Sequence, residues 1–410
     1  MADKIKILDI INTASSARQL LLNRVAAVNR CPEFDNWVVC GPGAEVETLR
    51  EAGIPCEVID SPPGISLGHV SPVAVVTALA RLYRFIRRER FDVVHTHGPV
   101  QGVLGRVAAR VAGVPVIIHT EHGAVYHDNQ NPLARALYIN VERVMRRITH
   151  HLLFLTESEM EHAVRCGIAT RSQARWIGNG IRLSDFSRTE APPKRRDDGK
   201  VIIVSVARLD PVKNLLMLLR VMSRLRRTHP HAECWLLGDG VCREELERFA
   251  EEHRLSNVKF LGYRTNVAEI IARADIAVLT SIKEGVPRGL MEPMAMGVPV
   301  VATDVKGNRD VVADGECGFL APLDDDAAFG ERLAMLIGRP DLRTALGESA
   351  SRRIHERYDE QKVIERILLL YREILRTRAW TEELPSRNAA AGGLGKNYEH
   401  DTEGTGTPAF

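Results

Sequence analysis

Two glutamates, Glu284 and Glu292, stand at the ends of a loop rich in glycine and proline, within the segment EGVPRGLMEPM. Carboxylate oxygens accept hydrogen bonds from hydroxyls, so this pair suits a sugar or a ribose. Because a first helical turn does not need the N–H that Pro293 lacks, we expect Glu292 in the first turn of a helix ending at Gly297. Its charge would be favourable there. The alternative is a capping glutamate and a solvent-exposed glutamate without a ligand.

Arg208 and Lys213 lie in the segment SVARLDPVKN, whose first residues complete an apolar run typical of a strand. A forked guanidinium and a point-charge ammonium together suit a diphosphate. Asp210 and Pro211 favour a helix start, and the free N–H groups of a helix start would point at the same anion. The alternative is a surface basic pair that binds nothing.

The sequence gives little support for other common binding motifs, such as those for dinucleotides, nucleoside triphosphates or metals. The segments NTASSAR, CGPGAE and LGDGVC do not complete a dinucleotide fingerprint, and no Walker A sequence occurs. The seven cysteines form no C-x-x-C pair, which indicates reduced thiols rather than disulfides or a zinc site. His95 and His97 have no carboxylate-rich partner sequence. We therefore interpret them as structural or acceptor-side residues and expect no bound metal.

Short apolar runs alternate with longer amphipathic runs, which is typical of doubly wound α/β sheets. In the first half we expect strands at 5–11, 36–40, 56–60, 92–96, 114–120 and 151–156, and helices at 16–29, 43–52, 72–89, 100–112, 132–147 and 157–166. In the second half we expect strands at 201–207, 233–239, 258–262, 275–281 and 298–304. Most of these strands lack polar alternation, as parallel strands covered on both faces do.

This pattern predicts two Rossmann-like domains, over residues 1–186 and 201–356, joined by a linker at 187–200. Ligands bind beyond the carboxyl ends of parallel strands, so we expect the site in a cleft between the domains. The run QKVIERILLLYREILR at 361–376 predicts a long last helix within a segment at 357–380. The polar, glycine-rich tail at 381–410 is expected to be disordered.

Composition sets further limits. A chain of 410 residues with 45% hydrophobic and 26% charged residues is typical of a soluble two-domain protein. A net charge of +2 argues against a nucleic-acid partner. No apolar run approaches the roughly 18 residues that span a bilayer, and Asp9 interrupts the first run, so we expect a cytoplasmic protein without a signal peptide. The basic runs RLYRFIRRER and ERVMRRITHH leave two interpretations open: solvated helix faces, or attachment to an anionic inner membrane face.

Taken in order, six segments resemble the family 4 glycosyltransferases, which are retaining enzymes of the GT-B fold, and among them the polysaccharide-assembly type. The segments are DVVHTHG (92–98), HTEHG (119–123), IGNGIRLSDF (177–186), ARLDPVKN (207–214), FLGYRTNVAEI (260–270) and EGVPRGLMEPMAMGVPVVAT (284–303). The resemblance extends from residue 5 to about residue 378. It implies that the first domain is on the acceptor side, that the second binds a nucleotide sugar, and that the last helix crosses back to the first domain.

The resemblance also implies roles for single residues. Glu284 would face the transferred sugar, and Glu292 would hold the ribose hydroxyls. Arg208 and Lys213 would neutralise the diphosphate and the charge of the leaving group. His122, in the segment EHG, matches the family's histidine beside the donor sugar. These four residues, Glu284, His122, Arg208 and Lys213, form the expected catalytic set, and the alternative for His122 is a structural loop histidine.

Further positions follow from the same resemblance. The expected nucleobase contacts are Gly262, Tyr263 and Arg264, and the expected contacts to sugar hydroxyls are Gly285, Val286, Pro287, Arg288, Gly289 and Leu290. Ser15 and Ser16 stand where the family commonly has Gly-Gly beside the donor phosphates. The expected acceptor-side residues are His95, His97, His119 and His127. Pro293, Asn308 and Asp310 also depart from the common family pattern.

The expected activity is therefore that of a hexosyltransferase that moves a sugar with retention from a nucleotide sugar, UDP-linked by the bias of the family. The expected acceptor is a lipid-linked saccharide or another precursor of a cell-envelope glycan. Three alternatives stay open: transfer to a soluble small molecule, a catalytically silent glycan-binding protein, and a nucleotide-sugar 2-epimerase of the same fold. Members of this fold usually work without a divalent ion, so the expected requirement is a nucleotide sugar and no metal or other cofactor.

Overall fold

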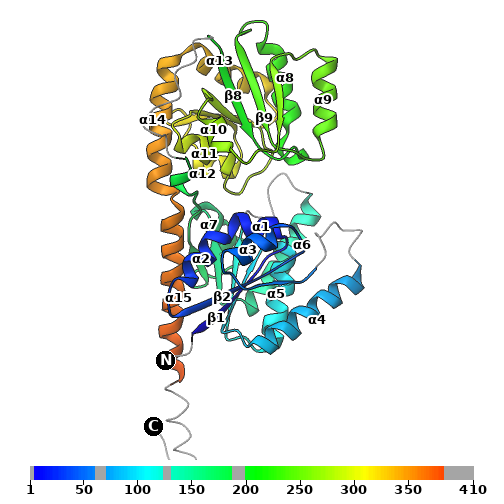
Figure 1. Cartoon of the computed structure of the whole chain (residues 1–410), viewed down its shortest axis with the longest axis vertical. Helices are drawn as coiled ribbons and strands as arrows, with labels where there is room; N and C mark the ends of the chain where they lie inside the picture. Colours follow the sequence, from blue (N-terminus) through cyan, green and yellow to red (C-terminus); the bar gives the residue numbers. More distant parts are fainter. Residues whose placement is uncertain (1–3, 61–70, 123–130, 187–198, 383–410) are drawn as a thin grey trace, which may run out of the picture. The chain divides into compact units, whose positions relative to one another are not determined.

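The computed structural model describes residues 4–60, 71–122, 131–186 and 199–382, and its elements are labelled in Figure 1. Most of the linker expected at 187–200 and nearly all of the tail expected at 381–410 lie outside these residues. The chain divides into two compact units, residues 1–364 and residues 365–410. The first unit contains two parallel sheets, each with helices, as the sequence predicts.

The first sheet has seven strands in the order β3-β2-β1-β4-β5-β6-β7. Their bounds are β1 Ile5–Ile10, β2 Phe34–Cys40, β3 Cys56–Val58, β4 Val93–His97, β5 Val116–Glu121, β6 His151–Phe154 and β7 Ala174–Trp176. Every pair of neighbours is parallel. The order changes direction beside β1, which lies between β2 and β4. The sequence did not predict β7, a strand of three residues that is too short for a hydrophobic period to reveal.

The helices around this sheet are α1 Ala14–Leu20, α2 Leu22–Asn29, α3 Glu45–Glu51, α4 Pro72–Glu89, α5 Pro99–Ala112, α6 Pro132–Met145 and α7 Glu157–Arg165. The expected helix at 16–29 is two helices, which divide at Leu21 (φ −115°, ψ −29°). One core joins β1 and β4 to α4 and α5, with Leu8, Leu82 and Ala108 buried in it. Another core contains Ala17 and Val25 of α1 and α2. Both faces of the strands are therefore covered, which accounts for their apolar sequences.

The second sheet has six strands in the order β10-β9-β8-β11-β12-β13. Their bounds are β8 Val201–Val206, β9 Ala232–Leu237, β10 Val258–Gly262, β11 Ile276–Leu279, β12 Val300–Thr303 and β13 Gly318–Ala321. All neighbours are again parallel, and the order changes direction beside β8. The sequence did not predict β13, which is short and contains glycine.

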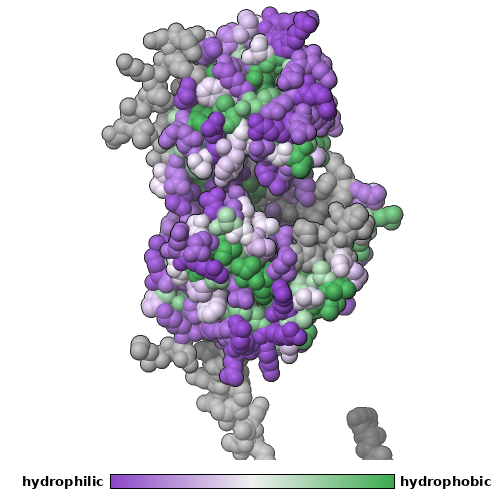
Figure 2. All heavy atoms as spheres, turned by 45° about the vertical axis from the view of Figure 1, so that its right-hand side comes forward, coloured by the Kyte–Doolittle hydropathy of each residue, from purple (hydrophilic) through white to green (hydrophobic). Residues whose placement is uncertain are grey.

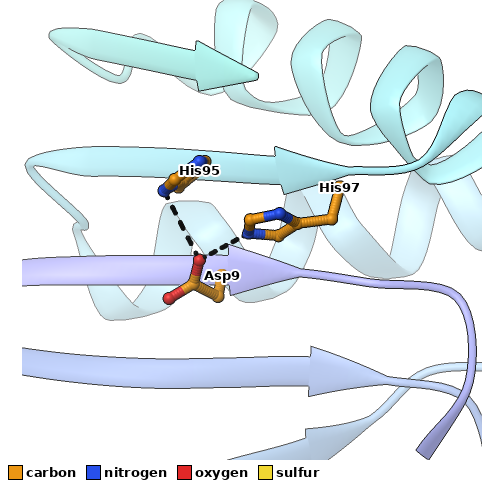
Figure 3. A group of neighbouring side chains, drawn as sticks. All are labelled: Asp9, His95 and His97. Carbon is orange, nitrogen blue, oxygen red and sulfur yellow. Dashed lines mark hydrogen bonds and ion pairs between the residues drawn. The ribbon is translucent and has the colours of Figure 1, made fainter. Parts of the chain in front are cut away.

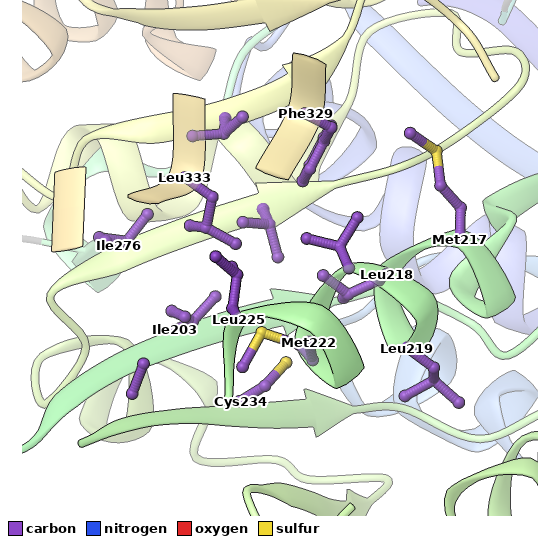
Figure 4. Packing of buried hydrophobic residues seen from close by; sticks show 14 of the residues in the cluster. Ile203, Met217, Leu218, Leu219, Met222, Leu225, Cys234, Ile276, Phe329 and Leu333 are labelled. Atoms are coloured by element: carbon purple, nitrogen blue, oxygen red, sulfur yellow. The ribbon is translucent and has the colours of Figure 1, made fainter. Parts of the chain in front are cut away.

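The helices of this domain are α8 Leu215–Leu225, α9 Arg243–Glu252, α10 Val267–Ile271, α11 Arg288–Ala295, α12 Lys306–Val311, α13 Asp326–Gly338 and α14 Pro340–Arg357. On one face of the sheet, Phe329 and Leu333 of α13 share a core with Leu218 of α8 and Ile203 of β8 (Figure 4). Leu290 and its neighbours in α11 belong to a separate core that also holds Ile202 and Val204. Successive residues of β8 thus enter different cores, as the alternation of a strand requires.

The chain continues as α15, Glu360–Glu382, which is longer than the helix expected at 361–376. The division between the two compact units falls inside this helix. That the last helix returns to the first domain stays a prediction.

Candidate active site

In the second domain, the predicted site residues follow two adjacent strands. The strand order changes direction between β8 and β11, and ligands of such sheets bind at this position, beyond the carboxyl ends of the strands. The loop after β8 contains the 3₁₀ turn Pro211–Lys213, and the loop after β11 runs from Thr280 to Pro287. The Thr280 hydroxyl donates to the Lys213 carbonyl over 2.9 Å, and the Ile282 N–H donates to the Val212 carbonyl over 2.9 Å.

Lys213 and Glu284 contact each other beyond the carboxyl ends of β8 and β11. The Lys213 Nζ donates to Glu284 Oε1 over 2.5 Å, and the Ser281 hydroxyl donates to the same oxygen over 2.6 Å. The Glu284 side chain is only 10% exposed, so these two donors hold it in one orientation. Neither of them, nor any other described residue, donates to the second oxygen, Oε2. The arrangement leaves one carboxylate oxygen to accept a hydrogen bond from a ligand hydroxyl.

Arg208 lies after the same strand as Lys213, but its environment is different. Its guanidinium pairs with Asp210 Oδ2 at 2.7 Å, and its side chain is 78% exposed. Exposed ion pairs contribute at most about 1 kcal/mol, so a diphosphate can displace Asp210 from this guanidinium. The expected α-helix start at Asp210 and Pro211 is wrong: these residues open a 3₁₀ turn, and α8 begins at Leu215 after Asn214, whose φ is +46°.

The helix that carries Glu292 differs from the expectation. The helix α11 begins at Arg288, so Glu292 lies in its second turn and Pro293 is inside the helix rather than in its first turn. Pro293 therefore removes a helical hydrogen bond, which a first-turn proline would not have done. Arg288 donates from Nε to Glu292 Oε1 over 3.0 Å. Burial raises the pKa of Glu292, and Arg288 opposes that rise.

Glycines allow the loop between Glu284 and α11 to approach its neighbours closely. A Cβ on Gly289 would lie 2.4 Å from the Val206 carbonyl oxygen at the end of β8. A Cβ on Gly307 would lie 2.1 Å from the Gly285 carbonyl oxygen. Asn308, a departure from the family pattern, donates from Nδ2 to the Thr303 carbonyl over 2.8 Å. These contacts fix the loop that presents the predicted sugar-binding backbone.

The predicted nucleobase segment lies at the end of β10. Gly262 adopts φ +70°, a conformation that favours glycine, and its carbonyl accepts from the Gly238 N–H over 2.9 Å. Tyr263 is 65% exposed and Arg264 is also exposed. Both side chains are thus accessible to a ligand, and their contact with a base stays a prediction.

In the first domain, a buried polar cluster lies at the corresponding change of strand direction, between β1 and β4 (Figure 3). Asp9 of β1 is the register partner of His95 of β4, and His97 points to the same side two residues further on. The Asp9 Oδ1 atom accepts from His97 Nε2 over 2.7 Å and contacts the Arg24 guanidinium of α2. Its Oδ2 atom accepts from Asn36 Nδ2 over 2.8 Å.

The charges of this cluster are balanced internally. Burial alone would raise the pKa of the Asp9 carboxyl, but Arg24 and then His97 hold that pKa well below its ordinary value. Burial lowers the pKa of both His95 and His97, so both rings are neutral. The buried Arg24–Asp9 ion pair thus provides the opposite charges, which is the usual condition for burying a carboxylate.

Asp9, His95 and His97 also have the spacing of a metal-binding group, with one ligating atom each within 4.8 Å of one another. The Arg24 guanidinium already contacts the carboxylate, and its nitrogens lie 3.4 Å from a ring nitrogen of each histidine. A divalent ion there would meet this fixed cation at short range, which is repulsive. We therefore interpret the group as a hydrogen-bond network. The expectation that no metal is needed stays a prediction.

The other predicted histidines divide between two faces of the first sheet. His122 follows β5, and its Nε2 lies 2.9 Å from His97 Nδ1, so it belongs to the cluster. His119 lies beside Thr96, with its Nδ1 2.9 Å from Thr96 Oγ1, and packs against Gly102 of α5. Because Thr96 and His97 are consecutive in a strand, His119 faces the opposite side from the cluster. His127 lies outside the described residues.

Ser15 and Ser16 lie in the first turn of α1, directly beyond β1, where the sequence predicted phosphate contacts. The Thr13 side chain caps this helix by accepting from the Ser16 N–H over 3.1 Å. A Cβ on Gly41 would lie 2.6 Å from the Asn12 carbonyl oxygen, so the loop after β2 packs closely on the loop after β1. Phosphate binding by the two serines stays a prediction.

Several residues of these clusters were not predicted from the sequence, among them Asp9, Arg24 and Ser281. Asp9 had been noticed only as an interruption of the apolar run IKILDII. One signal was available: a carboxylate inside a parallel strand that is covered on both faces must have a buried partner. The segment His95-Thr96-His97 of another strand offers two such partners. Arg24 and Ser281 had no comparable signal, because each lies in a segment of ordinary composition.

Two protein families match the chain. The Glycosyl transferase 4-like domain matches residues 25–180, and Glycosyl transferases group 1 matches residues 187–353. The putative glycosyltransferase EpsD of Bacillus subtilis is 32% identical over 303 residues, which cover 71% of this chain and 79% of EpsD. The UDP-Gal:alpha-D-GlcNAc-diphosphoundecaprenol alpha-1,3-galactosyltransferase of Escherichia coli is 28% identical over 275 residues, 64% of this chain and 70% of that enzyme.

Among solved structures, Anabaena HepE in complex with UDP and glucose superposes with a TM-score of 0.75. The two chains share 20% sequence identity, and the superposition covers 90% of this chain and 100% of HepE. At this identity the likeness establishes the fold, which is two Rossmann-like domains of the GT-B type.

Proposed function

Since the chain belongs to glycosyltransferase family 4, we propose that it transfers a sugar from a UDP sugar to a lipid-linked saccharide, with retention of configuration at the anomeric carbon. The observation that carries this proposal is the arrangement of Glu284, oriented by Lys213 and Ser281 with one carboxylate oxygen left for a ligand. It lies where the strand order of the second sheet changes direction, which is the expected ligand position in such a sheet.

The proposed donor fits the charges after β8. A UDP sugar presents a diphosphate, which would take the exposed guanidinium of Arg208 from Asp210 and approach the ammonium of Lys213. Both the E. coli relative, whose name specifies UDP-Gal, and HepE, which was solved with UDP and glucose, support this class of donor. Glu292, buried in α11 beside Arg288, would accept from the ribose hydroxyls.

The proposed reaction is a substitution on one face of the sugar. The bond from the anomeric carbon to the diphosphate breaks, and the acceptor oxygen bonds to that carbon on the same face. The acceptor proton passes to an oxygen of the leaving diphosphate, so the mechanism requires no protein base. In this scheme Arg208 and Lys213 stabilise the charge that develops on the leaving group, and Glu284 orients the sugar.

The proposed acceptor rests on the E. coli relative, whose printed name specifies a diphosphoundecaprenol-linked sugar. Two helices of the first domain offer a surface for such a lipid. Val73 and Val76 of α4 are 73% and 65% exposed, and α4 also carries Arg81, Arg84, Arg87 and Arg88. Leu133 of α6 is 82% exposed. Figure 2 shows apolar patches within a largely hydrophilic face of the molecule.

Apolar and basic side chains together suit the surface of an anionic bilayer. Within the described residues, no helix combines the length and the apolar character needed to cross a membrane. From the exposed apolar and basic side chains of α4 and α6 we propose peripheral attachment. Flotation with vesicles of phosphatidylcholine and phosphatidylglycerol at low salt tests it, and a chain that stays at the bottom of the gradient excludes it.

The activity itself is tested in two steps. A thermal-shift panel of nucleotide sugars is expected to single out a UDP sugar, and that donor is then incubated with lipid-linked or soluble acceptors. Mass spectrometry of the products, with the anomeric configuration assigned by NMR, reads out both the acceptor and retention. A product on a soluble acceptor alone would favour the soluble-substrate alternative, and an inverted anomer would refute the proposed mechanism.

A further inference from the structure

A continuous line of hydrogen bonds lies at the carboxyl ends of the central strands of the first sheet and joins His122, His97 and Asp9. His122 Nε2 lies 2.9 Å from His97 Nδ1, and His97 Nε2 lies 2.7 Å from Asp9 Oδ1. His97 and Asp9 are buried, whereas His122 is partly exposed. The line therefore runs from the interior of the sheet to a partly exposed side chain.

The positions of the hydrogens along this line follow from its buried end. Arg24 keeps Asp9 ionised, so the carboxylate can only accept hydrogen bonds. A ring nitrogen 2.7 Å from a carboxylate oxygen must then carry a hydrogen, and this nitrogen is His97 Nε2. Arg24 also lies 3.4 Å from His97 Nε2, but two donors do not bond each other, so that contact does not compete.

The remaining hydrogens are then determined in turn. A neutral imidazole carries one N–H, so His97 Nδ1 has a lone pair and accepts from His122 Nε2–H. Burial lowers the pKa of His122 well below its ordinary value, so this ring is neutral as well. Its Nδ1 consequently carries a lone pair. No described residue makes a hydrogen bond with that nitrogen.

The neighbouring ring, His95, has contacts that are compatible with the same tautomer. His95 Nδ1 lies 3.4 Å from the Arg24 guanidinium, which is a donor, and His95 Nε2 lies 2.6 Å from Thr120 Oγ1. With the hydrogen on Nε2, His95 would accept from Arg24 at Nδ1 and donate to the Thr120 hydroxyl. Of the two rings, it is His97 that contacts His122.

We propose that Asp9 and His97 are positioning residues that hold His122 in the Nε2–H tautomer, so that its Nδ1 accepts a hydrogen bond from a hydroxyl of a substrate sugar. This inference rests on the proposed function. It specifies that the group facing His122 is a hydrogen-bond donor. A deoxy analogue loses this bond, and a carboxylate at the same place meets a second acceptor, which is repulsive.

The tautomer is measured first, on the full-length protein without substrate. Long-range ¹H–¹⁵N correlation of protein labelled at histidine distinguishes bare from protonated ring nitrogens. His97→Phe and His122→Phe assign the signals by their disappearance. We expect bare Nδ1 and protonated Nε2 in both rings. A protonated Nδ1 in His122, or an imidazolium at neutral pH, would overturn the proposal. Because no turnover is needed, this result does not depend on whether the proposed transfer occurs.

The positioning role is measured by a second set of variants. His97→Phe removes the acceptor for His122, whereas His97→Asn replaces it with an amide oxygen near the position of Nδ1. We expect kcat/KM to fall about tenfold or more for Phe, the loss of roughly one hydrogen bond to the transition state, and to recover in part for Asn. A purely structural site would favour Phe, which is closer in volume. Equal values for Phe and Asn, or wild-type values for both, would overturn the positioning role.

Thr120→Val is the matched control. It removes the partner of His95 in the same buried cluster and leaves the line from Asp9 to His122 intact. We expect its kcat/KM to stay within about twofold of wild type at an equal melting temperature. A fall as large as that of His97→Phe would assign the effect to general packing of the cluster and overturn the specific role of His97.

Binding measurements distinguish a hydroxyl of the donor from one of the acceptor. A donor hydroxyl predicts that His97→Phe and His122→Phe weaken binding of the UDP sugar and leave binding of UDP unchanged. An acceptor hydroxyl predicts an unchanged Kd for the UDP sugar and a raised KM for the acceptor. If neither quantity changes in either variant, His122 does not contact a substrate hydroxyl, and the proposal fails.

Discussion

The Lys213 ammonium lies 2.5 Å from Glu284 Oε1, although the two residues are 71 positions apart in the sequence. The contact joins the loops after β8 and β11 where the strand order changes direction. The same carboxylate oxygen also accepts from Ser281. Glu284 is therefore held by its neighbours before any ligand binds, which is the preorganisation that catalytic electrostatics requires.

Replacing Glu284 tests this arrangement directly. We expect Glu284→Gln to lower kcat about 100-fold or more, because the amide keeps the shape but loses the charge opposite Lys213. Product formation measured by mass spectrometry under initial-rate conditions reads this out. Glu316→Gln, at an exposed position, is the matched control and should behave as wild type. Undiminished turnover in Glu284→Gln would refute the assigned site.

Glu292 predicts a pH-dependent difference in stability. Burial raises the pKa of this carboxyl in the folded protein, so the folded state favours the protonated form more than the unfolded state does. The contribution of Glu292 to stability is therefore least favourable above the raised pKa and improves as the pH falls through it. A neutral amide avoids the cost of burying the charge. We expect Glu292→Gln to gain in Tm relative to wild type at pH 7, and this gain to shrink towards pH 4.5.

Melting curves of both proteins across that pH range provide the measurement. Arg288→Gln is a second test variant, because it keeps Glu292 but removes the partner that opposes the raised pKa. Its Tm should fall more steeply than that of the wild type between pH 4.5 and pH 7. A Tm difference that grows as the pH falls would contradict the direction of the shift.

The space around Gly289 is too small for a side chain. A Cβ at this position would lie 2.4 Å from the Val206 carbonyl oxygen, so Gly289→Ala forces α11 away from β8. We expect a loss of about 1–3 kcal/mol in the free energy of unfolding, measured in urea. Activity should also fall, because α11 carries both Glu292 and Arg288.

Gly338→Ala is the control for this substitution. It also lies in a helix, α13, but a Cβ there would have no atom within 4 Å. It should be neutral or stabilising by up to about 1 kcal/mol, since alanine favours a helix over glycine. Equal effects at the two positions would show that the contact with Val206 is not the cause.

The buried pair of Asp9 and Arg24 predicts strong coupling. Their side chains are 0% and 8% exposed, so removing one partner leaves an unpaired buried charge. We expect Asp9→Asn or Arg24→Gln alone to cost about 3–5 kcal/mol, and the double variant to cost less than the sum. Urea unfolding of the four proteins forms the required cycle. Additive losses would mean that the two charges do not stabilise each other.

The same pair sets the sign of a pH effect. Arg24 holds the pKa of Asp9 below its ordinary value, so the stabilisation is present above that ordinary value and is lost as the pH falls towards the lowered one. The cost of Arg24→Gln should accordingly be larger at pH 7 than at pH 3.

Local sequence was sufficient for the architecture. Apolar runs such as VIIVSV at β8 have no polar alternation, and a strand with this composition is stable only when helices cover both faces. The predicted strands and the predicted helices of the first domain therefore agree with the structure to within a few residues, apart from the division of the helix at 16–29. The short β7 and β13 and most helices of the second domain were not predicted. The ordered motifs were also sufficient for the family, because they recur at the ends of those strands.

Helix positions at the site were harder to predict. Pro293 was placed in a first turn because proline is costly further inside a helix. In the structure it lies inside α11, where Leu290, Met291 and Met294 are buried in the core. Burial of this apolar face outweighs the missing hydrogen bond, and a rule based on local backbone chemistry does not include that contribution.

The amino-acid sequence by itself determined the two parallel sheets, the family, and the residues Glu284, Lys213 and His122 as candidates. Only the tertiary structure decided the partners at the site: Lys213 pairs with Glu284, and Arg288 pairs with Glu292. Asp9 bonds His97, which in turn contacts His122. The physical reason is that hydrophobic periodicity is a local property of the chain. Pairing of buried polar groups, in contrast, depends on which strands become neighbours, and Asp9 and His97 meet only because β4 lies beside β1.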